Sequence, residues 1–162
     1  MAADLLGYKV KALLCSEIAE DAILVTKVAF PEAVQLGPVQ DVTDAMIEEL
    51  TNRYDTEIFV FTMGPPCTDA SLLNNQRAGA HGPHNVLREE AKRVYNTFEA
   101  MAVGRVVGIM DCTRMSDEDR VHYDAVFGSQ PFQLCARHWA PWKMPRGGVP
   151  ASRQLCLMAT PL

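Results

Sequence analysis

Residues 57–79 read EIFVFTMGPPCTDASLLNNQRAG and carry the strongest indication of fold class in the chain. It begins with four consecutive apolar residues, Ile58 to Phe61, whose types favour a β-strand covered on both faces. A glycine and two prolines then end the strand, and Cys67 follows them directly. The sequence therefore predicts a central, buried strand that carries a rigid polar loop at its carboxyl end.

On either side of this strand, apolar residues alternate between strand-like and helix-like periods. Further strands are predicted over residues 10–14, 33–39 and 105–110. One helix is predicted after the first strand, a second begins with Asp41 or Thr43 as its N-cap, and a third spans residues 86–101. The predicted apolar faces of these helices comprise Ile18, Ala22, Val25, Val28 and Ala29; Met46, Ile47 and Leu50; and Leu87, Ala91, Val94, Tyr95, Phe98 and Met101. This alternation is typical of a parallel α/β sheet with helices on both faces.

The composition indicates one domain, residues 1–162, with one continuous core, since the chain has 162 residues, is 48% apolar and shows no internal repeat. No apolar run approaches the roughly 18 residues that span a bilayer, and no secretory signal is evident, so we expect a soluble, intracellular protein. A net charge of −5 argues against broad neutralisation of nucleic-acid phosphates. A local positive face is still predicted near the C-terminus, from Arg137, Lys143, Arg146 and Arg153.

The five cysteines are odd in number and widely spaced, which fits neither a disulfide framework nor a zinc site. We expect reduced thiols and no metal. Three of them lie in apolar runs, where cysteine acts as a small buried hydrophobe. Cys67 differs, because the prolines before it would present its thiol rigidly, as a nucleophile requires; Arg137 is a candidate positive neighbour. The alternative is a free cysteine in a proline turn with no role.

Polar residues end each predicted strand, and ligands of open α/β sheets bind beyond those ends. The four ends are Ser16-Glu17, Gln40-Asp41, Gly64 to Cys67, and Asp111-Cys112. An acid after the first strand can accept hydrogen bonds from ribose hydroxyls, and one after the next can accept from an adenine amino group. This pattern predicts an adenosyl site. Helix N-caps or solvated turns would explain the same acids.

Taken in order, these motifs resemble the C5-cytosine DNA methyltransferase family, most closely its de novo eukaryotic class. That class has a Ser-Glu turn, an Asp-Val turn, and a Pro-Cys loop that continues through Asp and Ser to an Arg-x-Gly segment. The matching residues here are Ser16-Glu17, Asp41-Val42, Pro66-Cys67, Asp69, Ser71, Arg77 and Gly79. The resemblance is clear over residues 7–101, while residues 102–162 are divergent.

The resemblance implies a Rossmann-like methyltransferase sheet that binds S-adenosylmethionine, and a DNA substrate whose target cytosine is flipped out of the duplex. It implies catalytic roles for Cys67 as nucleophile, Asp111 in place of the family glutamate that contacts the base, and Arg137 from the family Arg-x-Arg pair. The residues implied in cofactor binding are Glu17, Ile18, Asp41, Val42 and Pro65. It also implies a nuclear location.

The match fails at three places, which predict a partial, divergent copy. The glycine-rich first motif and first strand of the family should precede the first predicted strand, where this chain begins, so S-adenosylmethionine is expected to bind weakly or not at all. Asp111 is one methylene shorter than the family glutamate, and Cys135 stands in place of the first arginine of the pair.

Two other functions remain open from the sequence. One is a catalytically inactive module that docks on an active methyltransferase chain or on chromatin. The other is a cysteine hydrolase, for which the candidate bases are His81, His84, His122 and His138.

Overall fold

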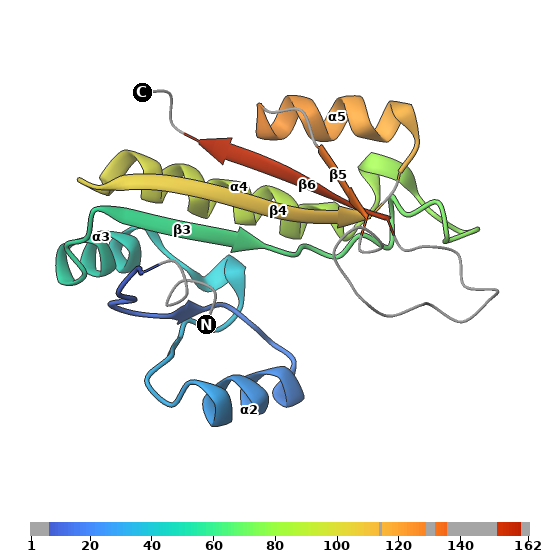
Figure 1. Ribbon diagram of the computed structural model, residues 1–162. Coiled ribbons are helices and arrows are strands. Elements are labelled where there is room, and N and C mark those ends of the chain that lie inside the picture. Colours follow the sequence, from blue (N-terminus) through green and yellow to red (C-terminus); the bar gives the residue numbers. More distant parts are fainter. Residues whose placement is uncertain (1–6, 114, 129–131, 136–151, 160–162) are drawn as a thin grey trace.

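The computed structural model describes residues 7–113, 115–128, 132–135 and 152–159 (Figure 1). The strands are β1 (Leu14–Cys15), β2 (Val34–Gln35), β3 (Ile58–Met63), β4 (Arg105–Thr113), β5 (Phe132–Cys135) and β6 (Ser152–Ala159). The helices are α2 (Glu20–Ala29), α3 (Asp44–Arg53), α4 (Asn85–Met101) and α5 (Asp117–Phe127), with short 3-10 turns η1 (Val39–Asp41) and η2 (Gly79–His81).

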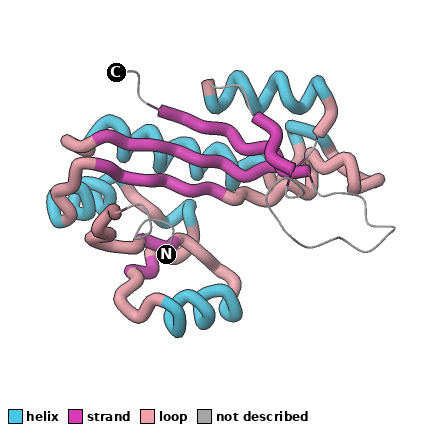
Figure 2. The backbone as a smooth tube through the Cα atoms, viewed as in Figure 1, coloured by secondary structure: helices cyan, strands magenta, loops and turns pink. Residues whose placement is uncertain are grey.

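The described strands form two sheets rather than the single sheet that the sequence predicted (Figure 2). β1 pairs with β2 in parallel, and a four-stranded sheet has the order β3-β4-β6-β5. The prediction of parallel pairing is confirmed for β3 with β4, but β6 runs antiparallel to both β4 and β5. The prediction of a wholly parallel sheet was therefore wrong, because β6, which was not predicted, lies between β4 and β5 and is antiparallel to both.

The first two strands are much shorter than predicted. β1 includes only the last residue of the segment 10–14, and β2 covers two residues of the segment 33–39. β2 ends just before Gly37, which has a left-handed φ of 76°, and Pro38, which has no N–H to donate to a ladder. β3 and β4 were predicted correctly and each extends further, to Met63 and Thr113.

The core lies between the β3–β4 pair and helix α4. Phe98 of α4 packs its ring against Phe59 and Phe61 of β3, at centroid distances of 5.8 and 6.0 Å. α3 adds Ile47 and Leu50 to the same cluster. The predicted apolar faces of α3 and α4 are therefore confirmed in their central residues, whereas Met101 at the end of the α4 face is exposed.

Burial of β3 on both faces, by contrast, was wrong for the described structure. Alternate side chains of a strand point to opposite faces. Ile58 and Val60, on the face away from α4, are 39% and 64% exposed. β3 is also the edge strand of its sheet, not a central one.

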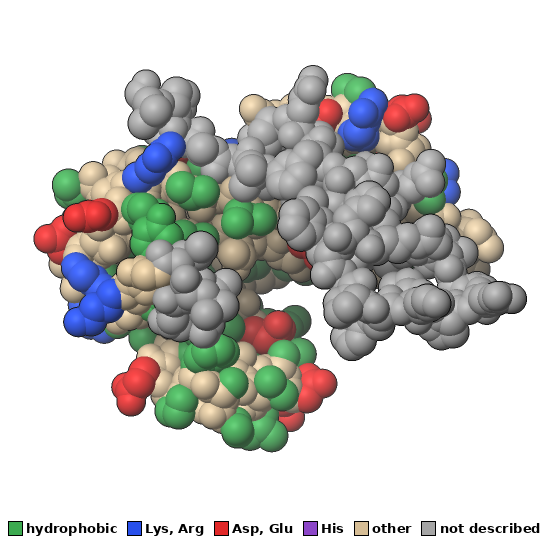
Figure 3. Space-filling view, in the orientation of Figure 1, with side chains coloured by type: hydrophobic (Ala, Val, Ile, Leu, Met, Phe, Trp, Pro, Cys, Tyr) green, Lys and Arg blue, Asp and Glu red, His purple; other side chains and the backbone are tan. Residues whose placement is uncertain are grey.

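Helix α3 begins at a defined cap, whereas helix α2 packs poorly. The Thr43 hydroxyl accepts a hydrogen bond from the Met46 amide at 3.3 Å, so Thr43 is the N-cap and Asp41 lies in η1. α2 buries none of its residues, and its predicted apolar face remains open in Figure 3, with Val25 and Val28 both exposed. In the part of the chain that the structure describes, no helix is long and apolar enough to cross a membrane.

Candidate active site

The loop that joins β3 to α4 carries Cys67; we call residues 64–84 the Cys67 loop. After Gly64-Pro65-Pro66, the Cys67 carbonyl accepts hydrogen bonds from the amides of Ala70 (3.2 Å) and Ser71 (2.9 Å). These bonds fold residues 67–71 into a single helical turn. The Cys67 side chain is half-buried and its thiol is free. The loop therefore presents the cysteine from a defined turn at the carboxyl end of β3.

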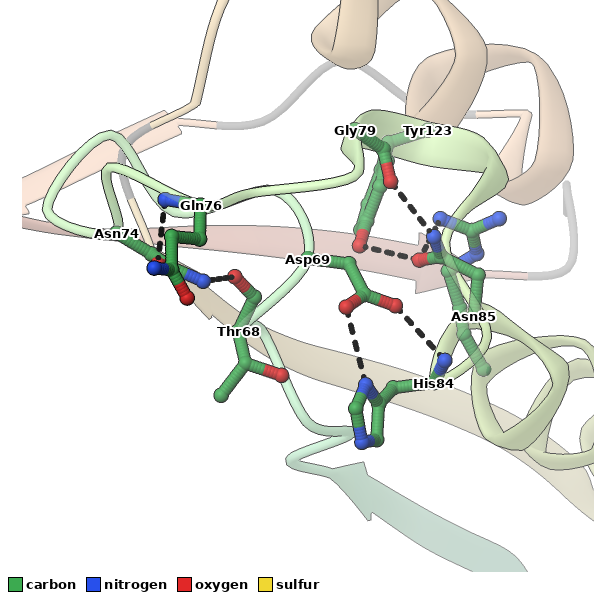
Figure 4. Close-up of polar contacts among 9 residues, drawn as sticks. Thr68, Asp69, Asn74, Gln76, Gly79, His84, Asn85 and Tyr123 are labelled. Atoms are coloured by element: carbon green, nitrogen blue, oxygen red, sulfur yellow. Dashed lines mark hydrogen bonds and ion pairs between the residues drawn. The ribbon is translucent and has the colours of Figure 1, made fainter.

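Asp69, two residues after Cys67, ties this turn to the start of helix α4 (Figure 4). One carboxylate oxygen accepts from the His84 backbone amide at 2.7 Å, and the other lies 3.0 Å from His84 Nδ1. Because a carboxylate can only accept, Nδ1 carries the proton of that bond. The Asp69 carbonyl also accepts from the Gly79 amide at 2.7 Å. Asp69 is buried, while the side chain of His84 is 55% exposed.

The last part of the Cys67 loop, residues 79–84, which we call its return arm, is joined to helix α5 by a second set of hydrogen bonds. The Asp119 carboxylate accepts from the Ala80 amide at 2.6 Å and from the Ser116 hydroxyl at 2.6 Å. Asn85 donates to the Gly79 carbonyl at 2.9 Å and accepts from the Tyr123 hydroxyl at 3.1 Å. The later part of the loop is thus held by buried polar side chains of α4 and α5.

Arg88 is a buried cation beside this network. Its Nη1 donates to the Asn85 side-chain oxygen at 2.9 Å, and its guanidinium carbon lies 4.1 Å from the centre of the Tyr123 ring. Such stacking partly compensates for the removal of the charge from water. The sequence did not single out Arg88, because a charged residue in a helical period usually lies on the solvated face.

Asp111 lies closer to the Cys67 loop than its sequence distance suggests, although it lies within β4 and not after it. The last β3–β4 pair joins Met63 to Met110, so Asp111 follows on β4 just as Gly64 follows on β3. Asp111 is half-buried and stands opposite Leu155 of β6. The structure therefore brings Asp111 to the start of the loop. Arg137, the third predicted catalytic residue, lies outside the described residues, as do His138, Lys143 and Arg146.

Of the predicted cofactor residues, Glu17 and Ile18 follow β1, Asp41 and Val42 follow β2 through the turn η1, and Pro65 follows β3. The register pairs Leu14 with Val34 and Cys15 with Gln35, and the Ser16 hydroxyl donates to the Gly37 carbonyl at 2.8 Å. Glu17 is half-buried, and its Oε1 accepts from the amides of Ile18 and Ala19 at 2.8 and 3.0 Å. The two carboxyl ends of the parallel pair are thus held side by side.

The other predicted cofactor residues differ in how exposed their side chains are to a ligand. Ile18 is 69% exposed, Asp41 is exposed and Pro65 is half-buried. The side chain of Val42 is in the core, and its carbonyl accepts from Arg93 at 2.7 Å. The Val42 side chain is therefore not accessible to a ligand.

Within the described ranges, neither a metal group nor a cysteine–histidine couple is present. No cluster of three or more His, Cys, Asp and Glu side chains could hold a metal ion there. His84 is hydrogen-bonded to Asp69, and the rings of His81 and His122 pack edge to face with their centroids 5.1 Å apart. None of these three histidines makes a hydrogen bond to the Cys67 sulfur that would favour a hydrolase.

The sequence singled out Cys67 but missed the pairing of Asp69 with His84. Asp69 was noted only as part of the family resemblance, and His84 only as one possible base. The local signal was the pair of glycines, Gly79 and Gly82, which allow the return arm to approach Asp69. Gly82 is buried against it, and a Cβ at this position would lie 2.3 Å from the Asp69 carboxyl.

We predict that Asp69 makes the free energy of unfolding vary with pH in the acid range. The hydrogen bond from the His84 ring holds the pKa of the Asp69 carboxyl below its usual value of 3.8, against the effect of burial. A carboxyl whose pKa is lower in the folded state contributes stability above its unfolded pKa, and this is lost as pH falls through the folded pKa. Urea unfolding should therefore show wild type more stable than Asp69→Asn at neutral pH, with the difference shrinking below about pH 4.

The matched control for this prediction is Asp55→Asn, at an exposed aspartate. Its difference from wild type should stay near zero across the same range. A difference between wild type and Asp69→Asn that persisted unchanged into acid would show that the pairing with His84 does not stabilise the folded carboxylate.

Comparison with known proteins supports the fold. No protein-family model matches the sequence, and no curated protein matches it. The chain is similar to a solved structure described as a candidate DNA modification methyltransferase encoded within an E. coli prophage, with a TM-score of 0.63 and 16% identity. An rRNA methylase from Streptococcus thermophilus aligns with a TM-score of 0.39 and 11% identity, over 96% of this chain and 78% of that one.

The first likeness covers 93% of this chain but 40% of the prophage protein, so the chain spans less than half of that protein's length. It shows that this chain shares the overall α/β fold of that protein. The α/β class that the sequence predicted is therefore confirmed.

Proposed function

We propose that the protein is a DNA cytosine-5 methyltransferase that uses Cys67 as its nucleophile. The observation that carries the proposal is the placement of Cys67. A free, half-buried thiol follows Gly-Pro-Pro in a hydrogen-bonded turn at the carboxyl end of β3, beside the end of β4 that holds Asp111. The fold shared with the prophage protein, which is described as acting on DNA, supports this choice, and so do the ordered sequence motifs.

The chemistry explains why a cysteine is needed. Carbon 5 of cytosine is a poor nucleophile, so the Cys67 thiolate would add to carbon 6 and form a sulfur–carbon bond. The electron pair of the ring double bond then moves to carbon 5, which can attack a methyl group. Loss of the proton from carbon 5 and cleavage of the sulfur–carbon bond return the thiolate. Asp111 would hold a proton at ring nitrogen 3 and so draw electrons from carbon 6.

S-adenosylmethionine would supply the methyl group from its sulfonium sulfur. The residues at the ends of β1 and β2 fit its adenosyl part. Glu17 keeps Oε2 for ribose hydroxyls because Oε1 is already bonded to backbone amides, and Asp41 is exposed for an adenine amino group. Ile18, which is exposed beside Glu17, offers an apolar surface for a planar ring.

The experiment that tests this function is hydrogen exchange at carbon 5 of cytosine. Addition of Cys67 to carbon 6 labilises the hydrogen on carbon 5, so the protein should release tritium from DNA that contains 5-tritiated cytosine, even without S-adenosylmethionine. With S-adenosylmethionine, DNA that contains 5-fluorocytosine should trap a covalent adduct on Cys67, because fluorine cannot leave as a proton does. No tritium release and no adduct at Cys67 would instead support a catalytically inactive binding module.

We predict that Asp111→Glu raises turnover about tenfold or more, since a shift of about 1 Å in a catalytic group can change a rate a hundredfold. The longer acid restores the reach of the family glutamate to the base edge. Asp111→Asn is the matched comparison and should lower turnover, because it cannot supply the proton. Equal tritium release by all three proteins would remove Asp111 from the mechanism.

The finer assignments rest on the sequence resemblance and are part of the proposal. They are membership of the de novo eukaryotic class, a nuclear location, a role for Arg137 near the base, and docking on a partner methyltransferase chain. The loss of the first strand and motif of the family likewise remains a prediction from the sequence, as does weak binding of S-adenosylmethionine.

A further inference from the structure

Side chains close the Cys67 loop on itself where Asp69 meets His84. The two residues are 15 positions apart, and both oxygens of the Asp69 carboxylate are used in the contact. Two bonds to one residue fix the carboxylate's orientation as well as its position. Figure 4 shows the second ring nitrogen of His84 directed away from Asp69. The function proposed above assigns no role to either residue.

We propose that Asp69 and His84 form a positioning pair that sets the location of the Cys67 thiol. This inference rests on the proposed function for its purpose, but the pair itself rests on the contacts alone. Asp69 belongs to the same helical turn as Cys67, because the Cys67 carbonyl accepts from the amides of Ala70 and Ser71. Fixing Asp69 therefore fixes the backbone that carries the thiol.

The pair is anchored to a helix that packs in the core. His84 immediately precedes α4, a helix of 17 residues whose Val94, Tyr95 and Phe98 are buried in the core. The bond from the His84 backbone amide to Asp69 also satisfies a donor that the start of a helix leaves open. The turn at residues 67–71 is therefore held in place by a packed helix.

The contact between Asp69 and His84 depends on Gly82, because the missing side chain at this position leaves room for Asp69. A Cβ at Gly82 would lie 2.3 Å from Asp69 Oδ2 and 2.6 Å from Asp69 Cβ, closer than any real contact. Any larger residue at position 82 must push Asp69 away from His84. Gly82 donates its amide to the Gly79 carbonyl at 3.0 Å, so the return arm cannot easily move aside.

The test compares four variants of the whole chain by the rate at which iodoacetamide alkylates Cys67, followed by mass spectrometry of the Cys67 peptide. His84→Ala removes the ring donor, and Gly82→Ala displaces Asp69. His84→Asn keeps an amide N–H in the place of Nδ1. His81→Ala is the matched control, since His81 lies in the same loop and contacts His122 instead of Asp69.

Loosening the turn should expose the half-buried thiol, so His84→Ala and Gly82→Ala should be alkylated about fivefold faster than wild type. His84→Asn and His81→Ala should stay within about twofold of it. Circular dichroism confirms that each variant is folded. Alkylation of His84→Ala at the wild-type rate, in a folded protein, would overturn the proposal.

Tritium release from 5-tritiated cytosine DNA is the second readout, and it separates positioning from acid–base chemistry. A positioning role predicts a loss of roughly a hundredfold in His84→Ala and rescue in His84→Asn. Loss in both variants, with alkylation of His84→Asn unchanged, would show that His84 transfers protons and would overturn the positioning assignment. If wild type releases no tritium but the alkylation rates follow the expected order, the proposed function fails and the pair stands.

Discussion

Cys67→Ala is expected to abolish tritium release from 5-tritiated cytosine DNA, with a loss of at least about a thousandfold, because removal of a covalent nucleophile leaves no route to the carbon 6 adduct. The fold should be unaffected, since Cys67 is half-buried in a loop and is not part of the core cluster. The measurement compares initial rates of release at equal protein concentration, together with urea unfolding of both proteins.

The matched control is Cys15→Ala, because Cys15 is the other free, half-buried cysteine that the structure describes. It lies in β1, outside the Cys67 loop, and should release tritium at the wild-type rate. Cys67→Ser refines the test: it keeps the size of the side chain but its hydroxyl is not ionised near neutral pH, so it should fail like alanine. A Cys67→Ala protein with undiminished release would remove Cys67 as the nucleophile.

Phe98→Ala is expected to lower the free energy of unfolding by about 3–5 kcal/mol, as found when large core residues are truncated. Phe98 is buried on α4 and packs on Phe59 and Phe61 of β3, so its loss leaves a cavity between helix and sheet. Domains of this size are typically stable by about 5–15 kcal/mol, so the variant should keep only part of its stability. Urea denaturation followed by far-ultraviolet circular dichroism measures the change.

Val103→Ala serves as the control, because Val103 is 99% exposed between α4 and β4 and should change stability by no more than about 0.5 kcal/mol. Equal denaturation midpoints for Phe98→Ala and Val103→Ala would show that the contact between α4 and β3 is not the centre of the core. The same experiment reports on the site, since α4 also carries the anchor of the Asp69–His84 pair.

The elements that the sequence predicted well are those whose signals are local. The apolar runs at Ile58 and Arg105 predicted β3 and β4, and the helical period of residues 86–101 predicted α4 with its buried face. Thr43 was one of two proposed caps, and its side-chain bond to Met46 decided between them. In each case the periodicity of side chains along the chain determines which face can be buried.

The errors arose where packing against distant segments decides the outcome. Apolar residues in α2 and on the outer face of β3 have the types that favour burial, yet no described element covers Val25, Val28 or Val60. α5 was not predicted either, although Ser116 and Asp119 form a capping pair at its start and Gly128 ends it in a left-handed conformation. β6 pairs antiparallel with β4 between residues 40 to 52 positions apart, from Thr113 with Arg153 to Val107 with Ala159, and no local period predicts such a pairing.

For the site, local sequence alone was enough to predict that a rigid Gly-Pro-Pro turn places Cys67 at the carboxyl end of a strand. Proline and glycine restrict the backbone wherever they occur, so that conclusion needs no distant contact. The contact of Asp69 with His84, the bond from Ala80 to Asp119 and the alignment of Asp111 with Gly64 are instead products of tertiary packing. Hydrogen bonds between residues 15 or 39 positions apart depend on how helices pack on the sheet, and one sequence does not specify that geometry by any local pattern.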